Sequence, residues 1–99
     1  MFNMRITSRV DDMPIMDSIK QHLEKKFSSL ERYSNHIIDG EFILDEVRGR
    51  FVGEVILNVK GGTITAKATA KSPIDVIDEL KDKIKVQLNR YEEKMKSRR

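Results

Sequence analysis

The stretch that decides the fold is residues 61–80, GGTITAKATAKSPIDVIDEL, because its hydrophobic periodicity changes part-way along. Residues 63–70 alternate between apolar and polar side chains, which is typical of a strand with one buried face. The apolar positions are Ile64 and three alanines, so we expect a helix to pack closely against that face. Residues 72–75, SPID, have the composition of a helix start, with a capping serine, a first-turn proline and a carboxylate. The stretch therefore predicts a strand followed directly by a helix.

Beyond this start, apolar residues recur at the spacing of one helical face, which predicts a helix of roughly 20 residues, about 30 Å long. Its apolar seam consists of Ile77, Leu80, Ile84, Leu88, Tyr91 and Met95. A chain of 99 residues with no repeat, linker or low-complexity segment predicts a single domain, which we place at residues 1–95. Residues 96–99 are expected to form a basic, solvated C-terminal tail.

Two strand-like stretches precede the Gly61-Gly62 turn and cover residues 37–46 and 51–60. They are joined by residues 47–50, VRGR, in which glycine permits the positive φ that a tight hairpin needs. Together with the strand at residues 63–70, these stretches predict two consecutive antiparallel hairpins.

The N-terminal part of the chain adds one strand and one helix. Residues 2–7 alternate like a half-buried strand. Residues 15–30 carry apolar side chains at helical spacing and predict a first helix that ends near residues 34–35. Asp11, Asp12 and Pro14 are suited to the start of this helix. The complete order of elements is β-α-β-β-β-α.

This order predicts an α+β fold in which a four-stranded sheet carries both helices on one face. The first helix would cross over right-handed, so the first two strands are expected to be parallel and the others antiparallel. The opposite sheet face is expected to be polar and open to water. Double-stranded-RNA-binding domains share the α-β-β-β-α part of the order, which is a match of architecture alone.

The composition excludes several classes of function. The chain has no cysteine, which removes disulfides, thiolate metal sites and cysteine nucleophiles. His22 and His36 have no metal-ligand spacing, and Gly61-Gly62 lacks the Lys-Ser/Thr of a phosphate loop. No apolar run approaches the roughly 20 residues of a membrane span. We therefore expect a soluble cytoplasmic protein that is not an enzyme and has no metal, cofactor, small-molecule substrate or membrane partner.

The charge is divided unevenly along the chain. Residues 1–59 have a net charge of −2 and residues 60–99 a net charge of +5, which gives the total of +3. A basic C-terminal part favours a polyanionic partner, and nucleic acid suits it better than a membrane because no strongly apolar helix face accompanies it.

Basic residues lie on both flanks of the apolar seam of the second helix. At about 100° per residue, the basic and long polar side chains fall into two sets, one on each flank of the seam. The first set is Lys83, Gln87, Arg90 and Lys94, and the second is Lys81, Lys85 and Lys96. If the two helices lie side by side, their basic edges would form one cationic groove suited to phosphate backbones. The alternative is a solvated face in which lysines pair with nearby carboxylates.

Several segments together resemble a known family. They are Leu23-Glu24-Lys25-Lys26-Phe27, Leu30-Glu31-Arg32-Tyr33, Gly61-Gly62-Thr63 with Ala66, Ala68 and Ala70, Ile77-Asp78-Glu79-Leu80, Asp82-Lys83-Ile84, Gln87-Leu88 and Arg90-Tyr91-Glu92-Glu93-Lys94. In order and spacing, from about Asn3 to Lys96, the chain resembles the ribosome hibernation-promoting factors, also called ribosome-associated inhibitors or sigma-modulation proteins.

The resemblance implies a β-α-β-β-β-α fold and a stasis factor that occupies the mRNA and tRNA channel of the small ribosomal subunit. Such a factor inhibits translation in idle cells, through contacts with rRNA phosphates, and turns nothing over. By resemblance, the rRNA-binding residues are Lys25, Lys26, Arg32, Lys81, Lys83, Lys85, Arg90 and Lys94. The alternatives are a generic double-stranded-RNA binder and a protein-interaction module acting on a transcription factor.

The chain departs from the family pattern at two positions. Ile74 stands where an aromatic residue is common, and Glu92 stands where a lysine is common. The chain also resembles the short form of the family, without a C-terminal dimerisation domain or the longer tail of members that block ribosome pairing. This favours a factor that permits or promotes ribosome dimers, together with a second dimerising protein.

Overall fold

A computed structural model describes residues 3–10 and 13–97, and the side chains of these residues except 13–15 and 97. The elements are β1 (Asn3–Ser8), α1 (Met13–Phe27), a 3-10 segment η1 (Ser28–Tyr33), β2 (Ile37–Val47), β3 (Arg50–Val59), β4 (Gly62–Ala70) and α2 (Pro73–Ser97). This confirms the predicted order of strands and helices. The proposed capping by Asp11 and Asp12, and the side chain of Phe2, lie outside the described residues.

The four strands form one sheet in the order β1-β2-β3-β4. β1 pairs with β2 in parallel, whereas β2–β3 and β3–β4 are antiparallel, as predicted. The β2–β3 turn contains two residues, Arg48 and Gly49, with φ of 53° and 76°, and Val47 pairs with Arg50. Positive φ at both central residues is the geometry of a type I′ turn, whose twist matches that of the flanking strands.

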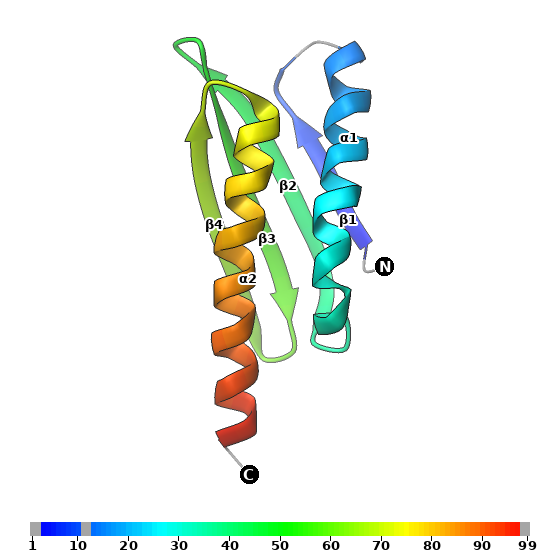
Figure 1. Cartoon of the computed structure of the whole chain (residues 1–99), viewed down its shortest axis with the longest axis vertical. Coiled ribbons are helices and arrows are strands. Elements are labelled where there is room, and N and C mark those ends of the chain that lie inside the picture. The colour runs from blue at the N-terminus through cyan, green and yellow to red at the C-terminus, as the bar shows by residue number, and fades with distance from the viewer. Residues whose placement is uncertain (1–2, 11–12, 98–99) are drawn as a thin grey trace.

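Both helices lie over the same face of the sheet, which confirms the predicted two-layer arrangement (Figure 1). The core lies between the layers and contains Ile19, Leu23, Phe27 and Leu30 from the first helical segment, Phe42, Leu44, Val55 and Leu57 from the sheet, and Val76, Ile77, Leu80, Ile84 and Leu88 from α2. These side chains are the ones that the helical and alternating patterns place on one face.

α2 approaches the sheet closely where the strands carry small residues. Ala66 and Ala68 of β4 are buried beneath it. At Gly53 of β3, a Cβ atom would lie 2.3 Å from Cγ1 of Val76. The predicted close packing on the alanine face of β4 is confirmed, and a glycine on β3 extends it.

The opposite sheet face carries no described helix, but it is not purely polar as predicted. Exposed threonines and Lys67 line β4, whereas Ile43 and Ile56 are half-buried near the middle of the sheet. Ile43 pairs with Glu54 and Ile56 with Glu41, so each isoleucine lies beside a carboxylate. Neighbouring side chains on this face therefore shield its apolar centre.

Two further expectations differ in detail from the structure. The first helical segment ends at Tyr33, close to the predicted residues 34–35, but it changes from an α-helix to a 3-10 segment after Phe27. The hydroxyls of Ser28 and Ser29 donate to the carbonyls of Lys25 and Lys26 three residues earlier, at 2.6 and 2.8 Å. Such bonds compete with the regular helical pattern and favour a tighter turn.

The second difference concerns the end of the apolar seam. Tyr91 is half-buried and Met95 is 42% exposed, so the seam is not covered along its whole length. The reason is that the C-terminal end of α2 projects beyond the strands, as Figure 1 shows. The helix continues through Ser97, so Lys96 and Ser97 of the expected tail are helical.

Candidate nucleic-acid interface

α1 and α2 run side by side and in the same direction (Figure 1). Two of the polar contacts between α2 and the first helical segment, which consists of α1 and η1, join residues 56 apart in sequence. Nε2 of His22 lies 2.7 Å from Oδ1 of Asp78, and the hydroxyl of Tyr33 donates to Oδ1 of Asn89. The constant offset means that one edge of α2 faces the first helical segment along its length.

The groove between the helices contains basic residues together with acidic ones. Nζ of Lys26 lies 3.9 Å from Oδ1 of Asp78, which also contacts His22. A guanidinium nitrogen of Arg32 lies 3.6 Å from Oε1 of Glu92. Two carboxylates of α2 therefore offset part of the positive charge that α1 and η1 bring to the groove.

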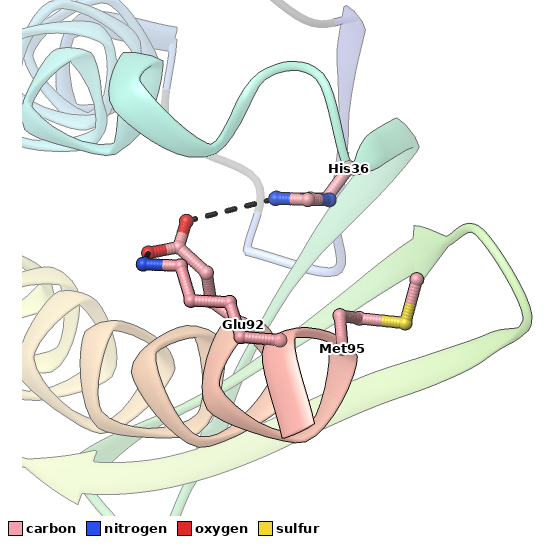
Figure 2. A pocket seen from close by; sticks show the side chains of 4 residues that line it. His36, Glu92 and Met95 are labelled. Atoms are coloured by element: carbon pink, nitrogen blue, oxygen red, sulfur yellow. Dashed lines mark ion pairs between the residues drawn. The ribbon is translucent and has the colours of Figure 1, made fainter. Parts of the chain in front are cut away.

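Glu92 is the centre of a small charge cluster at the C-terminal end of this groove. Besides Arg32, its carboxylate lies 3.6 Å from Nε2 of His36 and 3.6 Å from Nζ of Lys96. Figure 2 shows Glu92 and His36 pointing toward each other across a hollow of about 450 Å³, which Met95 and Lys96 also line. The Glu92 side chain is only 20% exposed, so its charge acts mainly on these neighbours.

The other edge of α2 faces β4. Nζ of Lys83 donates to the carbonyl of Lys67, and Nε2 of Gln87 donates to the carbonyl of Thr65, both at 2.6 Å. The hydroxyl of Tyr91 donates to the carbonyl of Lys60 in the β3–β4 turn. Of these three donors only Lys83 is charged, and its bond to a backbone carbonyl does not neutralise that charge.

A second hollow, of about 250 Å³, lies along this β4-facing edge. It is lined by Ile64, Gln87, Arg90, Tyr91 and Lys94. Arg90 and Lys94 are both exposed. Lys83 has one carboxylate nearby, that of Glu79 at 3.3 Å. The edge thus presents Lys83 and, beside a shallow, partly apolar hollow, the two basic side chains of Arg90 and Lys94.

The eight residues predicted to contact rRNA are all half-buried or exposed, but the structure divides them between the two edges of α2. Lys26, Arg32, Lys81 and Lys85 lie on the side of the α1–α2 groove, and Lys83, Arg90 and Lys94 lie on the β4 side. Lys25 lines a third hollow with His22 and Ile74, between α1 and the start of α2. The groove between the helices therefore holds only part of the predicted set, because the body of α2 separates the two groups.

Sequence reasoning missed the acidic partners within the interface. It treated His22 and His36 as isolated, whereas each contacts a carboxylate of α2. No local pattern signals a contact across 56 residues, because it depends on how the two helices align. Within residues 3–10 and 13–97, no group of three or more His, Asp or Glu side chains could hold a metal ion. The helices in these ranges are also too polar or too short to cross a membrane.

Comparison with known proteins gives a consistent result. Residues 5–96 match the family described as sigma 54 modulation protein / S30EA ribosomal protein. The chain is 31% identical to ribosome-associated factor Y of Haemophilus influenzae over 96 residues, which cover 97% of this chain and 88% of that protein. It is 27% identical to the ribosome hibernation promoting factor of Escherichia coli over 93 residues, which cover 94% and 98%.

A solved structure confirms the fold. A ribosomal subunit interface protein from Coxiella burnetii superimposes with a TM-score of 0.82 at 22% identity, covering 92% of this chain and 98% of that one. At this level of identity the likeness concerns the fold alone, and it agrees with the β-α-β-β-β-α order found here. The family match over nearly the whole length decides the assignment: the chain belongs to the sigma 54 modulation protein / S30EA ribosomal protein family.

Proposed function

We propose that this protein binds the ribosome and keeps it idle, as a hibernation factor. The observation that carries the proposal is the pair of basic edges on α2 in a chain of this family. The names of the relatives, ribosome hibernation promoting factor and ribosome-associated factor Y, support the same role. A cytoplasmic protein that acts in stationary phase or under stress fits this proposal.

The more specific proposal is that the protein occupies the mRNA and tRNA channel of the small subunit. Its shape suits a channel, because the body measures 48 × 23 × 18 Å and is therefore long and slender. Occupancy would exclude mRNA and tRNA and so inhibit translation. The mechanism is steric and electrostatic, and it needs no bond to be made or broken.

Phosphate contacts would supply the affinity. Lys83, Arg90 and Lys94 have long, flexible, positively charged side chains, and such side chains commonly contact the phosphates of a nucleic acid backbone. Each phosphate that is neutralised releases counterions, so binding of this kind weakens steeply as salt rises. The groove residues Lys26, Arg32, Lys81 and Lys85 would add contacts on the other edge, and Lys25 at its N-terminal end. Ribosome dimers, and a second protein that stabilises them, are a further part of the proposal.

A sedimentation experiment tests the proposal. Purified protein is mixed with separated small and large ribosomal subunits and pelleted at two salt concentrations. We expect it to pellet with the small subunit, to be displaced by mRNA plus tRNA, and to bind less at the higher salt. Protein that remains in the supernatant at low salt with intact, empty subunits would contradict ribosome binding.

A competition experiment distinguishes the hibernation role from the two alternative functions. A generic double-stranded-RNA binder would be displaced equally well by any A-form duplex, because such domains recognise shape. A module that acts on a transcription factor would show neither RNA dependence nor strong sensitivity to salt. Binding to the small subunit that survives an excess of naked duplex favours the hibernation role over both.

A further inference from the structure

We propose that the tip of the β2–β3 hairpin is a second RNA-binding element, which contacts backbone phosphates through Arg48 and Arg50 with Lys71 beside them. The sequence pattern assigns residues 47–50 only a turn. The inference rests on the proposed function, because the RNA in question is that of the ribosome. It adds a contact that lies away from both edges of α2.

The first observation is an accumulation of exposed positive charge at this tip. Phe51 pairs with Ala70, so Arg50, which precedes Phe51, and Lys71, which follows Ala70, end neighbouring strands side by side. Arg48 lies at the turn itself. All three side chains are exposed, and none makes an ion pair or side-chain hydrogen bond with any residue in ranges 3–10 and 13–97.

The second observation is that these three charges have no carboxylate partner among the described residues, whereas several other cations of the surface do. Lys26, Arg32 and Lys83 each have a carboxylate within 4 Å, and Arg9 pairs with Asp45 at 3.4 Å. The nearby carboxylate of Asp45 is therefore already engaged. Glu46 is exposed near the tip and reduces its charge by one, which still leaves an excess of two.

The third observation is the residue type at position 48. Its φ of 53° lies in the left-handed region, where glycine and asparagine are favoured and arginine carries a steric cost. The guanidinium stabilises no part of the described structure through polar contacts, because the side chain is exposed and makes no hydrogen bond or ion pair with the described residues. An arginine in an unfavourable backbone conformation, with no polar contact that compensates for it, suggests a functional role for its side chain.

The geometry points to RNA phosphate as the ligand. A guanidinium offers paired N–H donors that match two oxygens of one phosphate, which makes arginine better suited than lysine to this contact. A two-residue turn is narrow, and Val47 before it is 51% exposed, so the tip projects without bulky neighbours. It can therefore reach a phosphate that a broad helix face cannot approach.

The tip also lies at a useful place in the molecule. Figure 1 shows the β2–β3 turn at the end where α2 begins, opposite the projecting C-terminus. Lys94 lies in the last turns of α2, about 30 Å further along the helix axis. Contacts at both ends of a body 48 Å long would fix its orientation along the RNA, which one helix edge cannot do alone.

The test compares two double variants. Arg48→Asn with Arg50→Gln removes two charges from the tip, and asparagine tolerates the left-handed φ, so the fold is expected to be kept. Arg5→Gln with Lys67→Gln removes the same number of charges from the open sheet face, where both side chains are exposed. Thermal melting of both variants checks that each is folded.

Binding to small subunits is measured over a range of salt concentrations, and binding to a naked 20-base-pair RNA duplex is measured in parallel. We expect the tip variant to bind subunits on the order of 10-fold more weakly and to lose about 1 to 2 from the slope of log K against log salt. The sheet-face variant is expected to bind like the wild type. Arg48→Lys with Arg50→Lys should recover part of the loss, because charge is kept while the paired donors are not.

Each outcome decides something different. Equal binding by the tip and sheet-face variants, with normal binding by the wild type, overturns the inference and leaves the proposed function standing. A loss of subunit binding that leaves the slope of log K against log salt unchanged means that the tip does not contact phosphates, which also overturns the inference. If the wild type does not bind subunits at all, the proposed function fails, and the duplex measurement alone decides whether the tip binds RNA.

Discussion

The two edges of α2 carry similar numbers of basic residues but hold them in different surroundings. On the edge that faces α1, the carboxylates of Asp78 and Glu92 lie among the cations and contact several of them. On the edge that faces β4, Lys83 lies near Glu79 and donates to a backbone carbonyl, as Gln87 does, and Arg90 and Lys94 line a shallow hollow. The comparison shows that counting basic residues on a helix edge overestimates the positive charge available to a ligand where carboxylates lie beside them.

The largest expected effect comes from removing the β4-facing charges. The triple variant Lys83→Ala, Arg90→Ala, Lys94→Ala should lose about 2 to 3 from the salt slope of small-subunit binding and at least about 10-fold in affinity. Its melting temperature should change little, because these side chains flank the apolar seam rather than fill it. Sedimentation without ribosomes checks that the variant does not pellet by itself.

A matched triple variant on the groove side sharpens the comparison. Lys26→Ala, Lys81→Ala, Lys85→Ala removes the same formal charge from the edge that contains Asp78 and Glu92. We expect a smaller loss of affinity there, because two of the three lysines, Lys26 and Lys81, have a carboxylate within 4 Å. Equal losses would mean that the carboxylates move away when RNA binds, and normal binding by the β4-side variant would mean that its stripe is only a solvated surface.

The next prediction concerns the packing of α2 against the sheet, which fixes the position of both basic edges of the helix. Gly53→Ala would place a Cβ 2.3 Å from Cγ1 of Val76 and 3.1 Å from Cδ1 of Leu80, so the helix must shift. Overpacking of this kind costs about 1–3 kcal/mol in the free energy of unfolding. Chemical denaturation measures the cost, and binding should weaken as both edges are displaced.

The matched control for this variant is Gly62→Ala. A Cβ at Gly62 meets no atom within 4 Å, and its φ is not positive, so the substitution should leave stability nearly unchanged. If both alanine variants unfold at the same denaturant concentration as the wild type, α2 does not sit on β3 as closely as described.

The smallest expected effect is a gain. Glu92→Gln removes the carboxylate that lies near Arg32, His36 and Lys96, and should raise affinity for small subunits on the order of two- to fivefold. Glu93→Gln makes the same charge change at the neighbouring, exposed position. Binding isotherms at low salt compare the two. If both variants gain equally, net charge explains the effect and the charge cluster around Glu92 does not.

Much of the fold could be predicted because its signals are local. The hydroxyl of Ser72 accepts a hydrogen bond from the backbone N–H of Ile74, 3.1 Å away, as expected of a capping serine. The alternation in residues 63–70 likewise specified which side of β4 is buried. Periodicity also placed Lys83 and Lys85 on different flanks of the apolar seam.

What the sequence could not predict depends on contacts between distant segments. Rotation about the helix axis separates two flanks, but only the packed structure decides which one faces α1. The approach of Arg32 to Glu92 joins residues far apart in the chain, and no spacing rule signals it. Met95 is exposed because the strands end before α2 does. The periodicity of the helix sequence gives no information on where the strands end.

The bonds from α2 to β4 have a consequence for the outer edge of the sheet. β4 is the last strand of the sheet, so one side of its backbone has no strand to pair with. Thr65 and Lys67 are two residues apart, hence their carbonyls point the same way, and both are occupied by side chains of α2. An unpaired strand edge can pair with a strand of another molecule and so lead to aggregation. Carbonyls that already accept a hydrogen bond are not available for such pairing. In the free protein, Lys83 therefore covers part of this strand edge. An RNA phosphate that binds the Lys83 ammonium would remove that cover, and the bound RNA itself would then lie over the edge.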